Sequence, residues 1–254
     1  MLLKFVLCLV ICRIGAGAQS MGDFSVPAPM PERGTLILGF TGAFDHWDDP
    51  DRGVRRMALD IRRMKLPNVH VETLSHLRHR EAKRLVVLAL DANKNRKIDP
   101  EERERVKIVL YGQSMGGGEV VRLARDLKKM GVPVDLTVQV DSVSLRDGWI
   151  PPNVKRAANF YQRELLTVRG QDYIQAADSR RTKILGNVRF RYPVWVPYPL
   201  PELSMRRIFG GGHARMEADP VLWTAVTGLI LAPPELATAI LESVRGRVPW
   251  ACSM

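Results

Sequence analysis

Short apolar runs alternate along this chain with segments whose apolar residues recur at helical spacing. Runs that are rich in β-forming residues predict buried strands at 35–40, 69–73, 106–111 and 133–140. The segments between them predict helices at 54–64, 80–90 and 119–130. Strands that alternate with helices in this way build a mainly parallel open sheet with helices on both faces. We therefore predict an α/β fold.

The second half of the chain has a weaker pattern. The stretches 157–162 and 183–190 predict two further strands. Asp219-Pro220 begins a predicted helix that ends near Leu231, and a last helix ends near Val244. The segment 192–201 carries four prolines and is predicted to be a loop, because proline fits neither a helix interior nor a central strand.

The N-terminus has the layout of a secretory signal peptide. Lys4 precedes the apolar run 5–12, and Ala16-Gly17-Ala18 then supplies a small-residue cleavage signal. The predicted divisions are a signal peptide at 1–18, an extended leader at 19–33 and a single domain at 34–248. We therefore expect a secreted or periplasmic protein. An uncleaved membrane anchor is the alternative, although the apolar run is short for a membrane span.

Cysteine usage and charge limit which metal sites, disulfides and binding partners the chain can have. Cleavage would remove Cys8 and Cys12 and leave Cys252 alone, so we expect neither an internal disulfide nor a cysteine metal site. The net charge of +11 falls to +9 when Lys4 and Arg13 are removed. The remaining basic residues lack interleaved aromatics and a nucleic-acid motif, so we expect no nucleic-acid partner and favour a solvated basic surface. Contact with a membrane surface stays open, and the oligomeric state is not predicted.

The segment Gly112-Gln113-Ser114-Met115-Gly116 joins the third predicted strand to the following helix. A Gly-x-Ser-x-Gly pattern means little alone, since about one chain in ten of this size contains it by chance. A nucleophile elbow, however, requires a strand before the serine, a helix after it and small residues where the turn packs closely. All three are present, and a phosphate-binding glycine motif is not. We therefore predict that Ser114 is the nucleophile of a serine hydrolase.

A serine hydroxyl needs a base, and His213 is the candidate. Where this elbow occurs, the triad follows the order serine, acid, histidine, and His213 alone among the five histidines follows Ser114. It comes after Gly210-Gly211-Gly212, which we interpret as a flexible loop able to carry the imidazole over the sheet edge. The alternative is a surface histidine without a catalytic role.

The acid is predicted to be Asp141, which ends the fourth strand. Catalytic groups gather at the carboxyl ends of strands in open α/β sheets, and a carboxylate there could orient the imidazole. Asp147, Glu217 and Asp219 are competing acids, and Asp219 is equally suited to cap the helix that begins at Pro220.

Backbone N–H groups next to Ser114 could hold an oxyanion. The N–H of Met115 lies at the start of the helix, and the second donor is predicted to be that of Thr41 or Gly42, just past the first strand. A tight turn without a catalytic role is the alternative for Gly42.

At these residues the chain resembles the α/β-hydrolase superfamily, and within it a little-characterised bacterial group of secreted lipase-like proteins. The similarity extends from about residue 34 to 230 and is carried by LYGQSMGG, LTVQVDSV, IPPNV with ANFYQ, and RTKILGN. It implies a Ser114–Asp141–His213 triad and the cleavage of a carboxylic ester, of a small molecule or a lipid, without a required cofactor. Because the superfamily includes non-catalytic members, an inactive binding protein of the cell envelope is the alternative.

The same resemblance directs attention to segment 91–102, whose oxygen-bearing residues have the spacing of an EF-hand calcium loop. The matching residues are Asp91, Asn93, Asn95, Asp99 and Glu102. Arg96 replaces the glycine of the sharp turn, and Lys94 and Lys97 bring further positive charge. We interpret the segment as a degenerate calcium loop that has lost its metal, with a working calcium site as the alternative.

Aromatic residues of segment 145–201 admit two interpretations, an acyl pocket or ordinary core. They are Trp149, Phe160, Tyr161, Trp195 and Tyr198.

Overall fold

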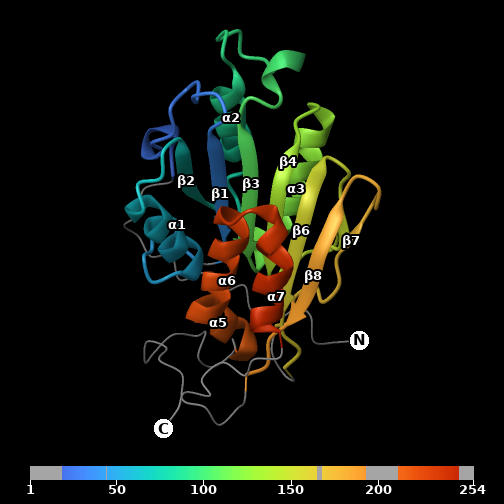
Figure 1. Cartoon of the computed structure of the whole chain (residues 1–254). Helices are drawn as coiled ribbons and strands as arrows, with labels where there is room; N and C mark the ends of the chain where they lie inside the picture. Colours follow the sequence, from blue (N-terminus) through green and yellow to red (C-terminus); the bar gives the residue numbers. More distant parts are fainter. Residues whose placement is uncertain (1–18, 44, 165–167, 193–210, 246–254) are drawn as a thin grey trace.

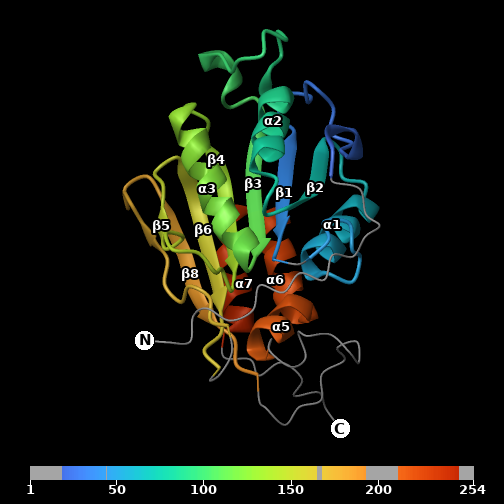
Figure 2. The same cartoon turned by 180° about the vertical axis from the view of Figure 1, so that it is seen from behind.

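A computed structural model describes residues 19–43, 45–164, 168–192 and 211–245. Its centre is a six-stranded, all-parallel sheet with helices on both faces (Figures 1 and 2), which confirms the predicted fold class. The six strands are β1 (Thr35–Thr41), β2 (Val69–Ser75), β3 (Lys107–Gln113), β4 (Val134–Val140), β6 (Val154–Tyr161) and β8 (Lys183–Arg189). The predicted signal peptide, all three cysteines, Trp195 and Tyr198 lie outside the described residues.

The strand order β2-β1-β3-β4-β6-β8 places a topological switch point at the β1–β3 pair. From β1 the chain first moves outward to β2 and then crosses back to β3 on the other side of β1. Connections that leave neighbouring strands in opposite directions open a crevice at their carboxyl ends, where ligands bind in open α/β sheets. Thr41, a predicted oxyanion donor, is at the end of β1, and Ser114, the predicted nucleophile, directly follows β3.

One face of the sheet is covered by α1 (Gly53–Arg63), α5 (Gly211–Ala218), α6 (Pro220–Leu231) and α7 (Ala237–Val244). Alternate residues of β1 and β3 point to this face, and Ile37, Val109 and Tyr111 are buried there against Val54 and Trp223. Figure 1 shows α6 and α7 in front of the central strands. None of the described helices is both long and apolar enough to cross a bilayer.

The other face is covered by α2 (His79–Leu90) and α3 (Met115–Lys129), which lie in front of the sheet in Figure 2. Leu36, Leu38 and Phe40, the residues of β1 that alternate with those of the first face, are buried here. Helix α3 begins at Met115, four residues before the predicted start, because Gly116, Gly117 and Gly118 belong to its first turn.

The other elements are short. They are the 3-10 turns η1 (Met21–Asp23), η2 (Pro100–Glu102) and η3 (Pro234–Leu236), and the two-stranded parallel sheet of β5 (Trp149–Ile150) and β7 (Gln175–Ala176). Segment 19–33, predicted as an extended leader, contains η1 and packs along β2. Its Gln19 Nε2 donates to the carbonyl of Thr73 at 2.7 Å.

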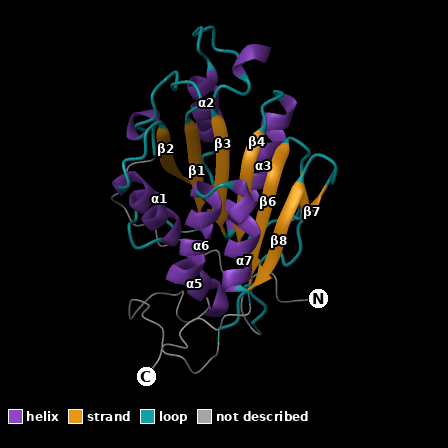
Figure 3. Cartoon of the chain, viewed as in Figure 1, coloured by secondary structure: helices purple, strands orange, loops and turns teal. Residues whose placement is uncertain are grey.

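The prediction of a flexible loop at 210–212 was wrong for the described part, because Gly211 and Gly212 belong to α5 (Figure 3). Three consecutive glycines favour a loop on intrinsic preference, since glycine is a poor helix former. Tertiary packing overrides that preference here. Met216 and Glu217 of the same helix are buried, and Gly212 lies so close to Glu164 that a β-carbon on it would be 2.7 Å from the carboxyl carbon.

A buried histidine links the two helices of the second face. His79 contacts the carboxylate of Glu119 through Nδ1, and its Nε2 lies 2.9 Å from Asp126 Oδ2. The hydrogen bond to Glu119 raises the pKa of His79 above its ordinary value of 6.5, although burial opposes the change. Lys129 and then His79 lower the pKa of Asp126 to about 2. The imidazole therefore bridges two carboxylates of α3 from the start of α2, and because carboxylates only accept hydrogen bonds, both contacts favour its protonated form.

This bridge makes stability depend on pH. Because the pKa of His79 is higher in the folded than in the unfolded chain, its contribution is fully present below about pH 6.5 and is lost as the pH rises through the raised value. We expect His79→Gln to lower the free energy of unfolding by about 1–3 kcal/mol at pH 6, and by less at pH 9. Urea denaturation at both pH values measures the difference. His70→Gln, on β2, is the control, and an equal loss by His79→Gln at both pH values would contradict a protonated His79.

Candidate active site

Ser114 occupies a sharp turn between β3 and α3. Its φ of 57° and ψ of −126° lie in a region that residues with a side chain rarely adopt, at a cost of about 1–3 kcal/mol. The turn is fixed on both sides. The Ser114 N–H donates to the carbonyl of Val140 at 3.0 Å, and its carbonyl accepts from Gly117 and Val143, each at 3.0 Å. This strained strand–turn–helix is the geometry of a nucleophile elbow.

Two glycines allow the turn to pack against the sheet. A β-carbon on Gly116 would lie 2.0 Å from the carbonyl oxygen of Phe40, and one on Gly112 would lie 2.4 Å from the carbonyl oxygen of Gly116. Both obstacles are backbone atoms, which cannot move aside like the end of a flexible side chain. The absence of side chains therefore lets α3 begin directly against the carboxyl end of β1.

We expect Gly116→Ala to destabilise the protein by about 1–3 kcal/mol or more, because the added methyl group overlaps the backbone of β1. Gly228→Ala is the matched control. Gly228 lies inside α6, where a β-carbon would be 3.3 Å from the nearest atom, in the side chain of Ile240. Its replacement should change stability by less than about 1 kcal/mol, with helix propensity favouring alanine. Thermal denaturation of both variants measures the difference, and equal midpoints would show that the close approach is not required.

Asp141 and His213 are joined by a hydrogen bond. His213 Nδ1 lies 2.7 Å from Asp141 Oδ2, although 72 residues separate the two in the chain. The carboxylate is completely buried and accepts three further hydrogen bonds, from the Gln162 N–H at 3.3 Å, Gln162 Nε2 at 2.9 Å and the Gly170 N–H at 3.1 Å. With Nδ1–H donating to Asp141, the other ring nitrogen of His213 is left as the acceptor.

The three competing acids are engaged elsewhere. Asp147 Oδ2 accepts from the hydroxyl of Ser142 at 2.5 Å. Glu217 accepts from the N–H of Gly53 at 2.6 Å, and burial raises its pKa. Asp219 caps α6, because its side chain accepts hydrogen bonds from the N–H groups at the start of that helix. This is the alternative that the sequence offered for Asp219. Asp141 is the acid that the structure brings to His213.

The position of His213 depends on how α5 is held. His213 lies in the first turn of this helix, and Glu217, one turn later, anchors it to the N-terminus of α1 through Gly53. The carbonyl of Glu217 also accepts from Trp223 Nε1 at 2.5 Å. The imidazole is therefore presented by a packed helix and not by a flexible loop.

Gln113 is a site residue that the sequence pattern did not single out. Its side chain is buried, and Gln113 Nε2 lies 3.2 Å from His213 Nε2. Among the described residues, no hydrogen bond joins Ser114 Oγ to His213 in this arrangement. Gln162 and Gly170 were missed as well, because nothing local in the sequence indicates that they enclose Asp141.

The loop after β1 lies against Ser114. A β-carbon on Gly42 would be 3.1 Å from the β-carbon of Ser114 and 2.8 Å from Gln113 Oε1. Met115, as the first residue of α3, has an N–H without an acceptor inside the helix. The structure therefore places both Gly42 and Met115 next to the serine, with Thr41 at the end of β1 next to Gly42.

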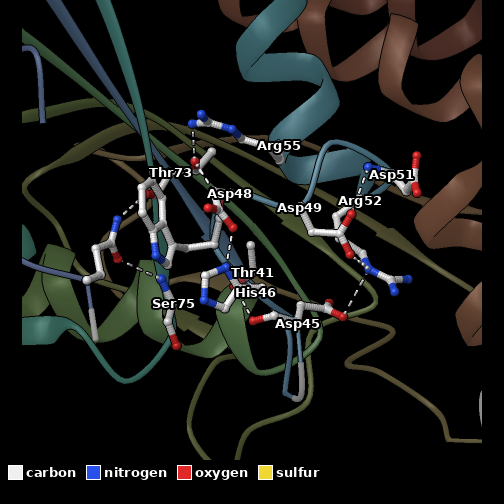
Figure 4. A network of polar contacts seen from close by, with 12 residues as sticks. Thr41, Asp45, His46, Asp48, Asp49, Asp51, Arg52, Arg55, Thr73 and Ser75 are labelled. Atoms are coloured by element: carbon white, nitrogen blue, oxygen red, sulfur yellow. Dashed lines mark hydrogen bonds and ion pairs between the residues drawn. The ribbon is translucent and has the colours of Figure 1, made fainter. Parts of the chain in front are cut away.

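A network of polar contacts fixes this loop (Figure 4). Arg52 Nε lies 3.0 Å from Asp49 Oδ2 and 3.5 Å from Asp45 Oδ1, and the Thr73 hydroxyl of the neighbouring strand donates to the carbonyl of Trp47 at 2.9 Å. Arg55 Nη1 in turn donates to the Thr73 hydroxyl at 2.8 Å. The backbone beside Ser114 is thus held by contacts to α1 and β2.

Segment 91–102 forms a closed loop at the other end of the molecule from the elbow. Asp91 accepts from the N–H groups of Asn95 at 2.9 Å and Arg96 at 2.8 Å, and Asp99 Oδ2 accepts from the side-chain amides of Asn93 and Asn95, each at 2.8 Å. Arg96 has a φ of 66°, the conformation that favours glycine at this place in a calcium loop. The third carboxylate of the set, that of Glu102, accepts from the N–H groups of residues 92, 93 and 99. The five predicted residues therefore lie together.

The described aromatic residues that were considered for an acyl pocket differ in burial. Phe160 is buried in the core, with its ring edge-on to that of Phe190 at 6.0 Å between centroids. Tyr161 lies under the guanidinium of Arg163, and Trp149 is more than half exposed on β5. Phe160 is therefore ordinary core.

The parallel sheet, its switch point and the elbow at Ser114 define an α/β-hydrolase fold. No protein-family description matches the sequence, and neither does any curated protein. Among solved structures, the chain is similar to a dienelactone hydrolase from Anabaena variabilis, with 16% identity over 79% of this chain and 86% of that one and a TM-score of 0.41. It is also similar to the dienelactone hydrolase-like promiscuous phosphotriesterase P91 from metagenomic libraries, with 16% identity over 80% and 86% and a TM-score of 0.33.

Proposed function

We propose that this protein is a serine hydrolase that cleaves a carboxylic ester. The observation that carries the proposal is the Asp141–His213 hydrogen bond, formed between distant parts of the chain beside the strained elbow that holds Ser114. A buried carboxylate, an imidazole oriented by it and a serine on an elbow are the three parts of a catalytic triad.

In the proposed reaction the Ser114 hydroxyl attacks the ester carbonyl while His213 Nε2 takes its proton. The same imidazolium then protonates the departing alcohol, which leaves an acyl group on Ser114. Water, deprotonated by His213, releases the acid and restores the serine. Asp141 holds the Nδ1 tautomer and stabilises the imidazolium that forms in each step.

For this step His213 Nε2 must exchange its contact with Gln113 for one with the Ser114 hydroxyl. Gln113 and Ser114 are adjacent in the chain, so the exchange is between neighbouring side chains. Hydrogen bonds of a catalytic site are often long or misaligned without substrate and tighten when it binds.

The oxyanion of the tetrahedral intermediate would be held by the N–H groups of Met115 and of Thr41 or Gly42. Two features support this assignment. Met115 is at the N-terminus of a 15-residue helix, where the helix dipole favours negative charge. Gly42 lies against Ser114 in a loop that the Arg52 contacts hold in place.

A fluorophosphonate probe, which labels activated serines, tests the proposal. We expect labelling of the wild type, none of Ser114→Ala, and a loss of about 10³-fold or more in kcat for p-nitrophenyl esters in Ser114→Ala and His213→Ala. Ser144→Ala, at an exposed serine in the loop after β4, is the matched control and should keep both activities. A panel of p-nitrophenyl esters of increasing acyl length identifies the preferred acid. A folded wild-type protein that is not labelled would favour the inactive envelope-binding protein instead.

We further propose a secreted or periplasmic location, supported by the signal-peptide pattern of residues 1–18. A small-molecule or lipid ester is the proposed substrate.

We propose that segment 91–102 is a metal-free structural loop. The three cations Lys94, Arg96 and Lys97 would oppose a bound divalent ion, and the side-chain amide nitrogens of Asn93 and Asn95 point at Asp99.

We expect millimolar calcium to leave the melting temperature of the wild type unchanged, because the loop already satisfies its carboxylates with its own N–H groups. Glu102→Gln should lower the melting temperature equally with and without calcium, since it weakens hydrogen bonds to three backbone N–H groups. Thermal shift measurements check both. A rise with calcium in the wild type that is absent in Glu102→Gln would instead identify a calcium site.

A further inference from the structure

Exposed apolar side chains gather at the carboxyl edge of the sheet, the edge from which a substrate reaches Ser114. Of the nine large apolar residues that are exposed in the described part of the chain, four lie in the connections that follow the strands β2, β3, β4 and β6. They are Leu77, Met115, Leu145 and Val168. Because all strands of the sheet are parallel, these four loops lie at one edge.

Local contacts keep these residues near the site. The carbonyl of Val168 accepts at 2.6 Å from Gln162 Nε2, the same amide that donates to Asp141. Ser144, next to Leu145, lies over the first turn of α3, where a β-carbon on Gly118 would be 2.5 Å from the β-carbon of Ser144. Leu77 lies in the turn closed by the hydrogen bond from the Arg78 N–H to the carbonyl of Ser75 at 2.9 Å.

Arginine follows the apolar residue in three of these four loops. The pairs are Leu77-Arg78, Leu145-Arg146 and Val168-Arg169, and together with Met115 we refer to them as the carboxyl-edge rim. Arg146 and Arg169 are exposed, whereas Arg78 pairs with Glu81 at 3.3 Å. Arg125 adds positive charge beside Leu145-Arg146, where its guanidinium is held by donating to the backbone carbonyls of residues 146 and 149.

We propose that the carboxyl-edge rim docks on an anionic lipid surface and presents Ser114 to ester bonds at that surface. The inference rests on the proposed hydrolase function. Exposed apolar side chains lose contact with water when they enter the acyl region, and neighbouring arginines are attracted to anionic headgroups. The four apolar residues stand on four separate connections, Met115 at the start of α3 and the others in loops, and not along one helix, which suits a fluid surface better than a folded partner. The excess of basic residues in the whole chain has the same sign as the rim.

Vesicle binding tests the membrane contact of the rim independently of catalysis. The full chain carrying Ser114→Ala is sedimented with vesicles of phosphatidylcholine alone and with vesicles containing about one-third phosphatidylglycerol. We expect at least about tenfold stronger partitioning to the anionic vesicles, weakened by salt. Leu77→Ser with Leu145→Ser should lower partitioning at least about tenfold, and Arg146→Gln with Arg169→Gln should remove most of the preference for anionic lipid.

The matched control is Leu66→Ser with Lys65→Gln, an exposed apolar–basic pair that precedes β2 at the opposite edge of the sheet. It should bind like the parent. Rim variants that bind as well as the parent, a control that loses as much, or equal binding to both vesicles would each overturn the proposal. Hydrolysis of a soluble p-nitrophenyl ester by the wild type separates the two ideas. Hydrolysis without vesicle binding removes the rim alone, and vesicle binding without hydrolysis removes the hydrolase alone.

Discussion

The site depends on the close approach of the start of α3 to the carboxyl end of β1. Gly116 lies against the carbonyl of Phe40, at a distance that no β-carbon could tolerate, and the turn that makes this approach holds Ser114 at a positive φ. The same contact brings Gly42 next to the serine and leaves the first N–H of α3 beside it. The positions of the proposed nucleophile and of the candidate oxyanion donors thus follow from one packing constraint at the switch point of the sheet.

The second half of the site is organised around a buried charge. Asp141 is withdrawn completely from solvent, which is costly for a carboxylate unless hydrogen bonds replace its hydration. The donors come from the end of β6, from the loop at Gly170 and from α5, so three segments converge on one side chain. This convergence explains why the imidazole of His213 has a defined orientation. It also explains why residue 170 is a glycine, since a β-carbon on it would lie 2.3 Å from the backbone of Asp141.

The fold and part of the site could be predicted from the sequence because their signals are local. The apolar runs of the strands and the helical spacing between them needed no tertiary information, and Ser114 was indicated by the strand before it and the helix after it. Asp141 and His213 followed from their order in the chain. Helix α5 was missed because its glycines oppose a helix, and only the anchoring of Glu217 and Trp223 shows why one forms. Gln113, Gln162 and Gly170 were missed because their roles are contacts across 100, 21 and 29 residues, and no local pattern encodes these.

The enclosure of Asp141 also has a consequence for the order in which the protein becomes complete. Its partners Gln162, Gly170 and His213 all follow it in the chain, the last by 72 residues. The elbow at Ser114 can form as soon as β1, β3 and α3 associate, whereas the acid–base pair has to wait for the last helices to dock on the sheet. A chain that emerges N-terminus first would therefore carry Ser114 without His213 beside it until its C-terminal helices are in place, and the proposed hydrolytic activity would appear only when folding is complete.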